Sequence, residues 1–147
     1  MKLNTMAAVM DFISRIETDS SAFYVTCAAR YPQLRDTLLS MAKENQKYEK
    51  MVKQTYFGVI TDAIEASFSF EHLNTDDYTL EITLPDNATL PEIIRKILEM
   101  EKTIETFYRK AAEVSIGLMA DIPRLFKRIA EKRKERGLAI EPLGKRL

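Results

Sequence analysis

Two glutamates stand at matching places in a short internal repeat. Glu17 lies in "RIETDSSAFY" (residues 15–24) and Glu101 lies in "EMEKTIETFY" (residues 99–108), and each precedes a Phe-Tyr pair by the same spacing. In a helix, the positions one turn before and after Glu17 are apolar or small, so its carboxylate falls in the stripe that faces a core. A carboxylate in a core is costly unless it is paired with a cation, protonated or bound to a metal. The repeat therefore predicts two buried acids that need one of these three forms of compensation.

Sparse glycine and proline divide the sequence into two helical hairpins that position these acids. Four segments carry apolar residues at spacings of 3, 4 and 7, which is typical of amphipathic helices that share one core. We therefore expect an all-α four-helix bundle that forms a single domain over residues 1–147. The helices are expected at about residues 5–30, 32–56, 89–117 and 121–136.

Two helix starts and one helix end have clear local signals. In "TLPE", Thr89 and Glu92 have the spacing of a capping box, and Pro91 lies in the first turn. Asp121 is expected to cap the fourth helix, and Gly137 is expected to end it.

The segment between the two hairpins, about residues 67–88, is polar and rich in Asn and Asp. It predicts a long irregular crossover. A short helical piece is expected at residues 59–66, and a strand-like stretch is expected at residues 78–84.

Polar residues interrupt all four apolar stripes. At about 100° per residue, the two glutamates fall near the centres of the first and third stripes, and other polar side chains fall inside the second and fourth. Because the four stripes face one core, we expect these side chains to meet. The predicted cluster consists of Glu17, Tyr24, Asn45, Tyr48, Glu101, Tyr108, Arg133 and Arg136.

Where two helices of a bundle each carry an acid, a Glu-x-x-His from each of the other two can complete a site for two iron or manganese ions. Three features of the chain match such a site. The motif Glu-x6-Tyr occurs in "ETDSSAFY" and "EKTIETFY", and it is followed by "FYVTCAAR" and "FYRKAAE". The segments that would carry the Glu-x-x-His motifs are "PQLRDTLLSMAKENQKY" and "IPRLFKRIAEKRKER". On the basis of these motifs, nearly the whole chain resembles the rubrerythrin branch of the ferritin-like proteins. The resemblance implies a ferritin-like bundle, a di-iron centre and reduction of peroxide. It implies ligands at Glu17 and Glu101, and it places the two Glu-x-x-His motifs at Asn45 and Tyr48 and at Arg133 and Arg136.

The sequence departs from the family at the four Glu-x-x-His positions. None of them holds a histidine, and the one histidine of the chain, His72, lies in the crossover. The cysteine-rich rubredoxin module of the family is also missing, since the chain has the single cysteine Cys27. We therefore expect a degenerate di-iron site with no metal, no other cofactor and no catalytic residue. In its place, Arg133 or Arg136 is expected to pair with Glu17 or Glu101, and the protein is expected to be a non-catalytic binding, regulatory or structural module.

Other interpretations of the same residues stay open at this point. Glu17 and Glu101 would also suit acids at the edge of the core, hydrogen-bonded to Tyr24 or to neighbouring serines. Arg133 and Arg136 would also suit a solvated last turn, where cations are favourable to the helix dipole.

A second class of function is an atypical di-metal oxidoreductase of the rubrerythrin peroxidase type. It would hold iron or manganese through Glu17 and Glu101, with Glu44 or Glu105 as further oxygen ligands. A third interpretation is a pocket between the helices that admits a small apolar ligand.

The composition limits the classes of partner and the cellular location that we expect. Lys plus Arg and Asp plus Glu both number 22, so the formal net charge is zero, and binding of nucleic acid by bulk electrostatics is not expected. No apolar run approaches the roughly 20 residues of a membrane span, and no secretory leader is recognisable. One cysteine cannot form an internal disulfide. We expect a cytoplasmic homodimer, and the sequence does not identify a small-molecule or protein partner.

Overall fold

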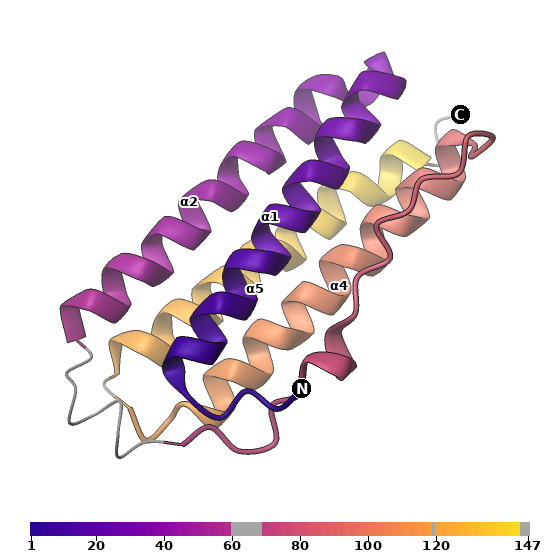
Figure 1. Cartoon of the computed structure of the whole chain (residues 1–147). Coiled ribbons are helices and arrows are strands. Elements are labelled where there is room, and N and C mark those ends of the chain that lie inside the picture. Colours follow the sequence, from indigo (N-terminus) through magenta and orange to yellow (C-terminus); the bar gives the residue numbers. More distant parts are fainter. Residues whose placement is uncertain (60–68, 119, 145–147) are drawn as a thin grey trace.

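The computed structural model contains four α-helices and no strand among the residues it describes, which are 1–59, 69–118 and 120–144 (Figure 1). The expected all-α class and the four helices are thus confirmed. The α-helices are α1 (Met6–Arg30), α2 (Arg35–Val59), α4 (Leu90–Val114) and α5 (Asp121–Ile140), and the 3₁₀ turns are η1 (Pro32–Leu34), η2 (Thr75–Tyr78) and η3 (Glu141–Gly144).

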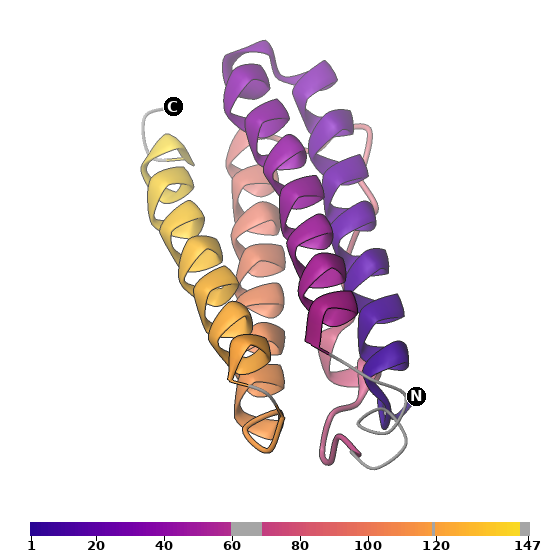
Figure 2. The same cartoon turned by 90° about the vertical axis from the view of Figure 1, so that its left-hand side faces the viewer.

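The helices form two antiparallel hairpins, α1 with α2 and α4 with α5, which lie side by side in both views (Figures 1 and 2). The described part of the crossover runs back along α4 and enters this helix at the end of the bundle where α1 and α2 are joined. As a result, α2 and α4 run in the same direction. The middle turns of all four helices then surround one central region.

Local signals explain where α1 and α4 begin. The Thr5 hydroxyl accepts a hydrogen bond from the Ala8 amide at 3.1 Å. Thr89 and Glu92 form both bonds of the capping box, at 3.4 and 3.2 Å. These bonds use amide groups that have no partner inside the helix, so the chain is directed into the helix at these residues.

The start and the end of α5 differ from the expectation. Ala120 is the N-cap and makes no side-chain capping bond, while Asp121 is the first helical residue. Gly137 does not stop the helix, which continues to the buried Ile140. Burial of Ile140 outweighs the cost of about 1 kcal/mol for glycine in a helix. Arg133 therefore lies well inside the helix and not in its last turn.

The predicted strand at residues 78–84 is wrong. Tyr78 ends η2, and residues 79–84 form no strand. A strand needs a neighbour to bond with, whereas this segment lies on α4, where Lys96 donates to the Thr83 carbonyl at 2.9 Å. Leu80 and Leu84 pack partly against the core. Apart from Val59, the last residue of α2, the helical piece expected at residues 59–66 lies outside the described residues.

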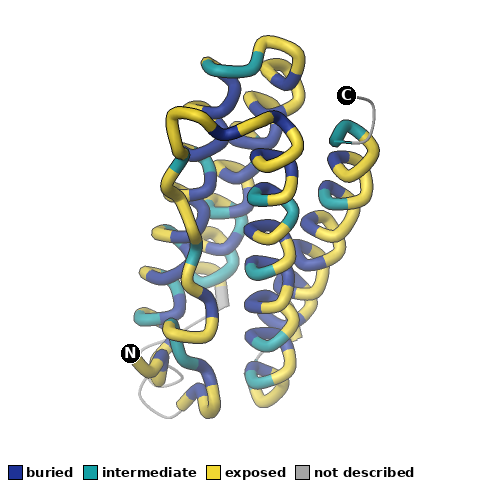
Figure 3. The backbone as a smooth tube through the Cα atoms, turned by 90° about the vertical axis from the view of Figure 1, so that its right-hand side faces the viewer, coloured by how far each residue is buried: buried dark blue, intermediate teal, exposed yellow. Residues whose placement is uncertain are grey.

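The buried side of every helix faces the centre of the bundle, and exposed residues cover the outside (Figure 3). Most of the core is apolar, but its middle contains charged and polar side chains. Among the described helices, none has the length and apolar content needed to cross a bilayer. The buried polar and charged residues are Glu17, Ser20, Asn45, Glu101, Glu105, Ser115, Arg133 and Arg136.

Candidate functional site

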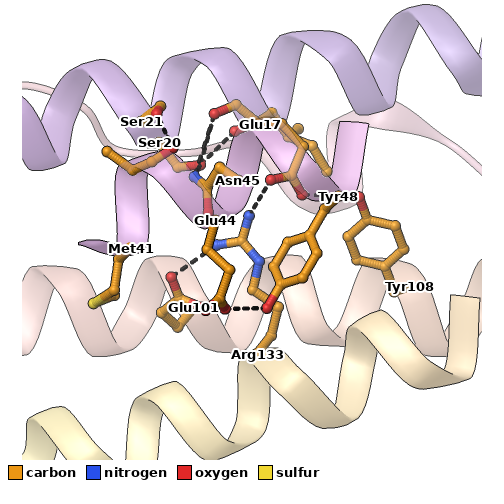
Figure 4. Close-up of polar contacts among 12 residues, drawn as sticks. Glu17, Ser20, Ser21, Met41, Glu44, Asn45, Tyr48, Glu101, Tyr108 and Arg133 are labelled. Carbon is orange, nitrogen blue, oxygen red and sulfur yellow. Dashed lines mark hydrogen bonds and ion pairs between the residues drawn. The ribbon is translucent and has the colours of Figure 1, made fainter. Parts of the chain in front are cut away.

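Arg133 of α5 lies between the two repeated glutamates at the centre of the bundle (Figure 4). Its Nη2 is 2.5 Å from Glu17 Oε2 on α1, and its Nη1 is 2.7 Å from Glu101 Oε1 on α4. The three side chains are 0%, 1% and 2% exposed. Charge-assisted bonds of this kind are the strong hydrogen bonds of proteins. One guanidinium therefore bonds two buried carboxylates and links the two hairpins.

Arg136, one turn later on α5, reaches toward α2. Its Nη1 donates to Asn45 Oδ1 at 2.6 Å and to Glu101 Oε1 at 3.3 Å. Its Nη2 donates to the Met41 carbonyl at 3.1 Å, and its Nε donates to Glu44 Oε1 at 3.1 Å. The side chain is 7% exposed. Arg136 thus connects α5 to α2 through an ion pair with Glu44 and through charge-assisted hydrogen bonds to two uncharged oxygens.

Each tyrosine of the repeat, Tyr24 and Tyr108, donates a hydrogen bond to the glutamate of the other repeat. The Tyr24 hydroxyl donates to Glu101 Oε1, and the Tyr108 hydroxyl donates to Glu17 Oε1 at 2.8 Å. Burial raises the pKa of each tyrosine well above its ordinary value, the charge of the bonded glutamate raises it further, and Arg133 opposes the rise. Both hydroxyls therefore stay protonated and act as donors. Each tyrosine bonds the glutamate of the other repeat.

Asn45 occupies the part of the cluster between α1 and α2. Its Nδ2 donates to Ser20 Oγ at 2.8 Å and to the Glu17 carbonyl at 3.3 Å, while its oxygen accepts from Arg136. The amide group is therefore satisfied on both sides. Ser20 and its neighbour Ser21 donate to backbone carbonyls of α1 and α2.

Tyr48 and Glu44, one turn apart on α2, form the side of the cluster nearest to solvent. The Tyr48 hydroxyl donates to Glu44 Oε1, and the Arg136 guanidinium lies 5.0 Å from the centre of the Tyr48 ring. The Glu44 side chain is 42% exposed. Burial raises its pKa, but the Tyr48 hydrogen bond and the Arg136 charge lower it more, so the pKa lies below its ordinary value. Glu44 is thus an anion that faces both Arg136 and solvent.

The structure brings all eight residues of the predicted cluster together. It also decides two alternatives. The solvated last turn is wrong for Arg133 and Arg136, because α5 continues for another turn and both side chains are buried. Tyrosine bonds to the acids are present, but they accompany the ion pairs and do not replace them.

The sequence did not predict two of the hydrogen-bond partners of Arg136. Glu44, which the sequence offered only as a possible metal ligand, accepts from Arg136 and from Tyr48, and Glu44 and Tyr48 have the four-residue spacing of helical neighbours. The Met41 carbonyl that accepts from Arg136 has no side-chain signal at all.

The arrangement does not fit the two metal ions that the resemblance implies. A guanidinium lies between the carboxylates of Glu17 and Glu101, where a shared dication would have to bind. Within residues 1–59, 69–118 and 120–144, no three or more His, Cys, Asp or Glu side chains are placed to hold a metal. Glu105, the other oxygen ligand considered, accepts from Arg109 at 2.8 Å instead.

Two further residues with reactive side chains lie away from the cluster. His72 is exposed in the crossover, with φ of 63°. Cys27 is buried in α1, and burial raises its pKa to about 11. A thiol of this pKa is protonated at neutral pH and is a weak nucleophile.

Comparison of the chain with protein-family models, with curated proteins and with solved structures found no match.

Proposed function

We propose that this protein is a non-catalytic helical module, related to the rubrerythrins and ferritin-like in its helix order, in which an ion-pair cluster replaces the di-metal centre. One observation carries the proposal, namely that the Arg133 guanidinium bridges Glu17 and Glu101 at 2.5 and 2.7 Å. In a ferritin-like site, the metals would lie between these two acids.

Charge explains why such a centre is stable without metal. Among the buried groups of the cluster, Glu17 and Glu101 contribute two negative charges, and Arg133 and Arg136 contribute two positive charges. Glu44, which is 42% exposed, adds a third anion at the side of Arg136 that faces solvent. Arginine keeps its charge at all ordinary pH values, so the positive half of this balance does not depend on pH. A metal ion between Glu17 and Glu101 would have to displace Arg133 from both carboxylates and leave this fully buried guanidinium without its anionic partners, which is strongly unfavourable.

The first test of this proposal is metal content. After purification without chelators, we expect well under one equivalent of iron or manganese per chain by elemental analysis, and no turnover of hydrogen peroxide. A matched variant restores two Glu-x-x-His motifs through Asn45→Glu, Tyr48→His, Arg133→Glu and Arg136→His, and we expect it to bind more iron than the natural chain. Close to two equivalents of iron in the natural protein, with an oxo-bridge absorption band, would instead favour the di-metal oxidoreductase.

The same proposal includes assembly and location. We expect a cytoplasmic homodimer that acts through its surface as a binding, regulatory or structural module. Sedimentation equilibrium checks the assembly, with an expected mass of twice the 16.9 kDa chain.

A further inference from the structure

A groove of about 370 Å³ lies between α4 and α5 near the C-terminal end of α5. Leu98 of α4 and Leu138 of α5 line its outer part, together with Gly137. A Cβ at Gly137 would make only an ordinary contact, 4.0 Å from Leu98 Cδ2. The packing of the chain therefore leaves room beside these two leucines for a side chain from outside.

Leu138 is 61% exposed, whereas every other large apolar side chain of α5 is buried. The buried ones face the bundle, and Leu138 lies on the flank of the helix, beside the groove. Removal of an aliphatic side chain from water is favourable. Contact of Leu138 with an apolar surface of another molecule would therefore be favourable.

Two opposite charges lie one turn before and one turn after Leu138. Lys134 precedes it by four residues and Glu141 follows it by three, so all three side chains lie on one stripe of the helix, and all line the groove. Both charged residues are exposed, and neither forms an ion pair with another residue that the structure describes. On the α4 side of the groove, by contrast, Lys102 and Glu105 pair with each other at 3.7 Å. Lys134 and Glu141 are thus available to a partner.

The order of these charges is complementary to itself when α5 is reversed. A two-fold axis that passes α5 at Leu138 places the α5 helices of two copies antiparallel. At a rise of about 1.5 Å per residue, Lys134 lies about 6 Å before Leu138, and Glu141 lies about 4.5 Å after it. Lys134 of each copy then lies opposite Glu141 of the other copy, whereas parallel helices would place like charges opposite each other.

We propose that the groove between α4 and α5 is the interface of a two-fold homodimer and that a second copy of this chain occupies it. Leu138 of each copy packs beside Leu98 and Gly137 of the other copy, and Lys134 of each copy pairs with Glu141 of the other. The inference names the contact surface of the proposed homodimer and thus rests on the proposed function.

Sedimentation equilibrium of the full chain tests the apolar contact. Leu138→Asp places two carboxylates next to each other at the two-fold axis, so we expect the dimer to be at least about tenfold weaker. Leu39→Asp is the matched control, because Leu39 is a 39% exposed leucine on α2 of the other hairpin. We expect its dimerisation constant to equal that of the natural chain.

A charge exchange tests the two-fold arrangement. Lys134→Glu and Glu141→Lys each place like charges opposite each other on both sides of the axis, so we expect each variant alone to form a dimer at least about tenfold weaker than the natural one. An equimolar mixture of the two variants restores opposite charges at both places. We expect the mixture to form a heterodimer about as strong as the natural dimer. Both positions are exposed, so far-UV circular dichroism should show unchanged helix content.

A natural dimer that Leu138→Asp leaves intact would overturn the inference but leave the homodimer of the proposed function standing. If Leu39→Asp dissociates that dimer, the interface lies on the hairpin of α1 and α2 instead. Charge variants that do not pair when they are mixed would show that the antiparallel arrangement is wrong, and they would also overturn the inference. A natural chain that stays monomeric would overturn both the inference and the proposed homodimer, while the metal content tests the ion-pair cluster separately.

Discussion

Arg133 is the residue on which the cluster depends most directly, because it bonds carboxylates from two hairpins and is fully buried. Its removal leaves the buried Glu17 without its cation and leaves Glu101 with Arg136 alone, at 3.3 Å. We expect Arg133→Ala to lower the free energy of unfolding by about 3–5 kcal/mol, whereas the exposed Arg128→Ala on the same helix should change it by less than about 0.5 kcal/mol. Urea unfolding of the two variants measures both values.

The pairing itself is measured by a double-mutant cycle of Arg133→Ala with Glu17→Gln. Because the two groups are in contact, we expect a coupling energy of about 0.5–3 kcal/mol. The ion-pair interpretation is wrong if Arg133→Ala and Arg136→Ala each cost less than about 1 kcal/mol and neither is coupled to Glu17 or Glu101.

Tyr108 makes the stability of the protein depend on pH in the alkaline range. Its pKa is well above the ordinary value in the folded state, because the hydroxyl is buried and faces the Glu17 carboxylate. The unfolded chain therefore loses this proton first, above about pH 10, and folding stability falls by up to about 1.4 kcal/mol per pH unit as the pH rises further. The contribution is fully present below pH 10.

Tyr108→Phe removes this dependence together with the hydrogen bond to Glu17. We expect the natural chain to be more stable than the variant at pH 8, and the difference to narrow between pH 9 and pH 11. Urea unfolding at each pH measures the difference. A difference that stays constant over this range would contradict a raised Tyr108 pKa.

At the scale of the helix, local signals predicted starts better than ends. The Thr89 capping box is a short-range pattern, and the structure forms both of its bonds. Gly137 gave an equally clear stop signal, but burial of Ile140 beyond it keeps the helix intact. Helical periodicity likewise identified which side chains face the core. It could not tell which partner each one meets, so the bonds of Tyr24 to Glu101 and of Tyr108 to Glu17 had to come from the structure.

Two glycines at the end of the chain should respond oppositely to alanine. Gly137 is helical, and a Cβ there has ordinary contact with Leu98, so Gly137→Ala should stabilise the protein by about 0.5–1 kcal/mol. At Gly144 a Cβ would lie 3.0 Å from Ile94 Cγ2, which is too close, so Gly144→Ala should destabilise it by about 1 kcal/mol. Thermal unfolding of both variants provides the measurement. A stabilising Gly144→Ala would show that η3 does not pack on α4.

At the scale of the whole molecule, the cluster forms the polar contacts between the two hairpins. Arg133 bonds Glu17, Arg136 bonds Asn45 and Glu44, and the two tyrosines exchange their glutamates across the same boundary. Apolar side chains can pack in several neighbouring arrangements, whereas these bonds form in only one. We infer that the cluster fixes the register of one hairpin on the other, a role that buried polar groups have in some proteins.

An apolar replacement of the whole cluster separates this role from stability. The variant carries Glu17→Leu, Tyr24→Phe, Asn45→Leu, Glu101→Leu, Tyr108→Phe, Arg133→Met and Arg136→Met. Every fully buried charge of the cluster is replaced, and only Glu44, which is 42% exposed, loses its partner Arg136. We therefore expect the free energy of unfolding to stay equal or to rise by about 1–4 kcal/mol, in contrast to Arg133→Ala alone. The hairpins should then pack in more than one register, which doubles or broadens amide NMR signals from the middle turns of the helices. A single sharp set of signals, as in the natural chain, would show that the apolar core alone fixes the register and that the cluster is not needed for it.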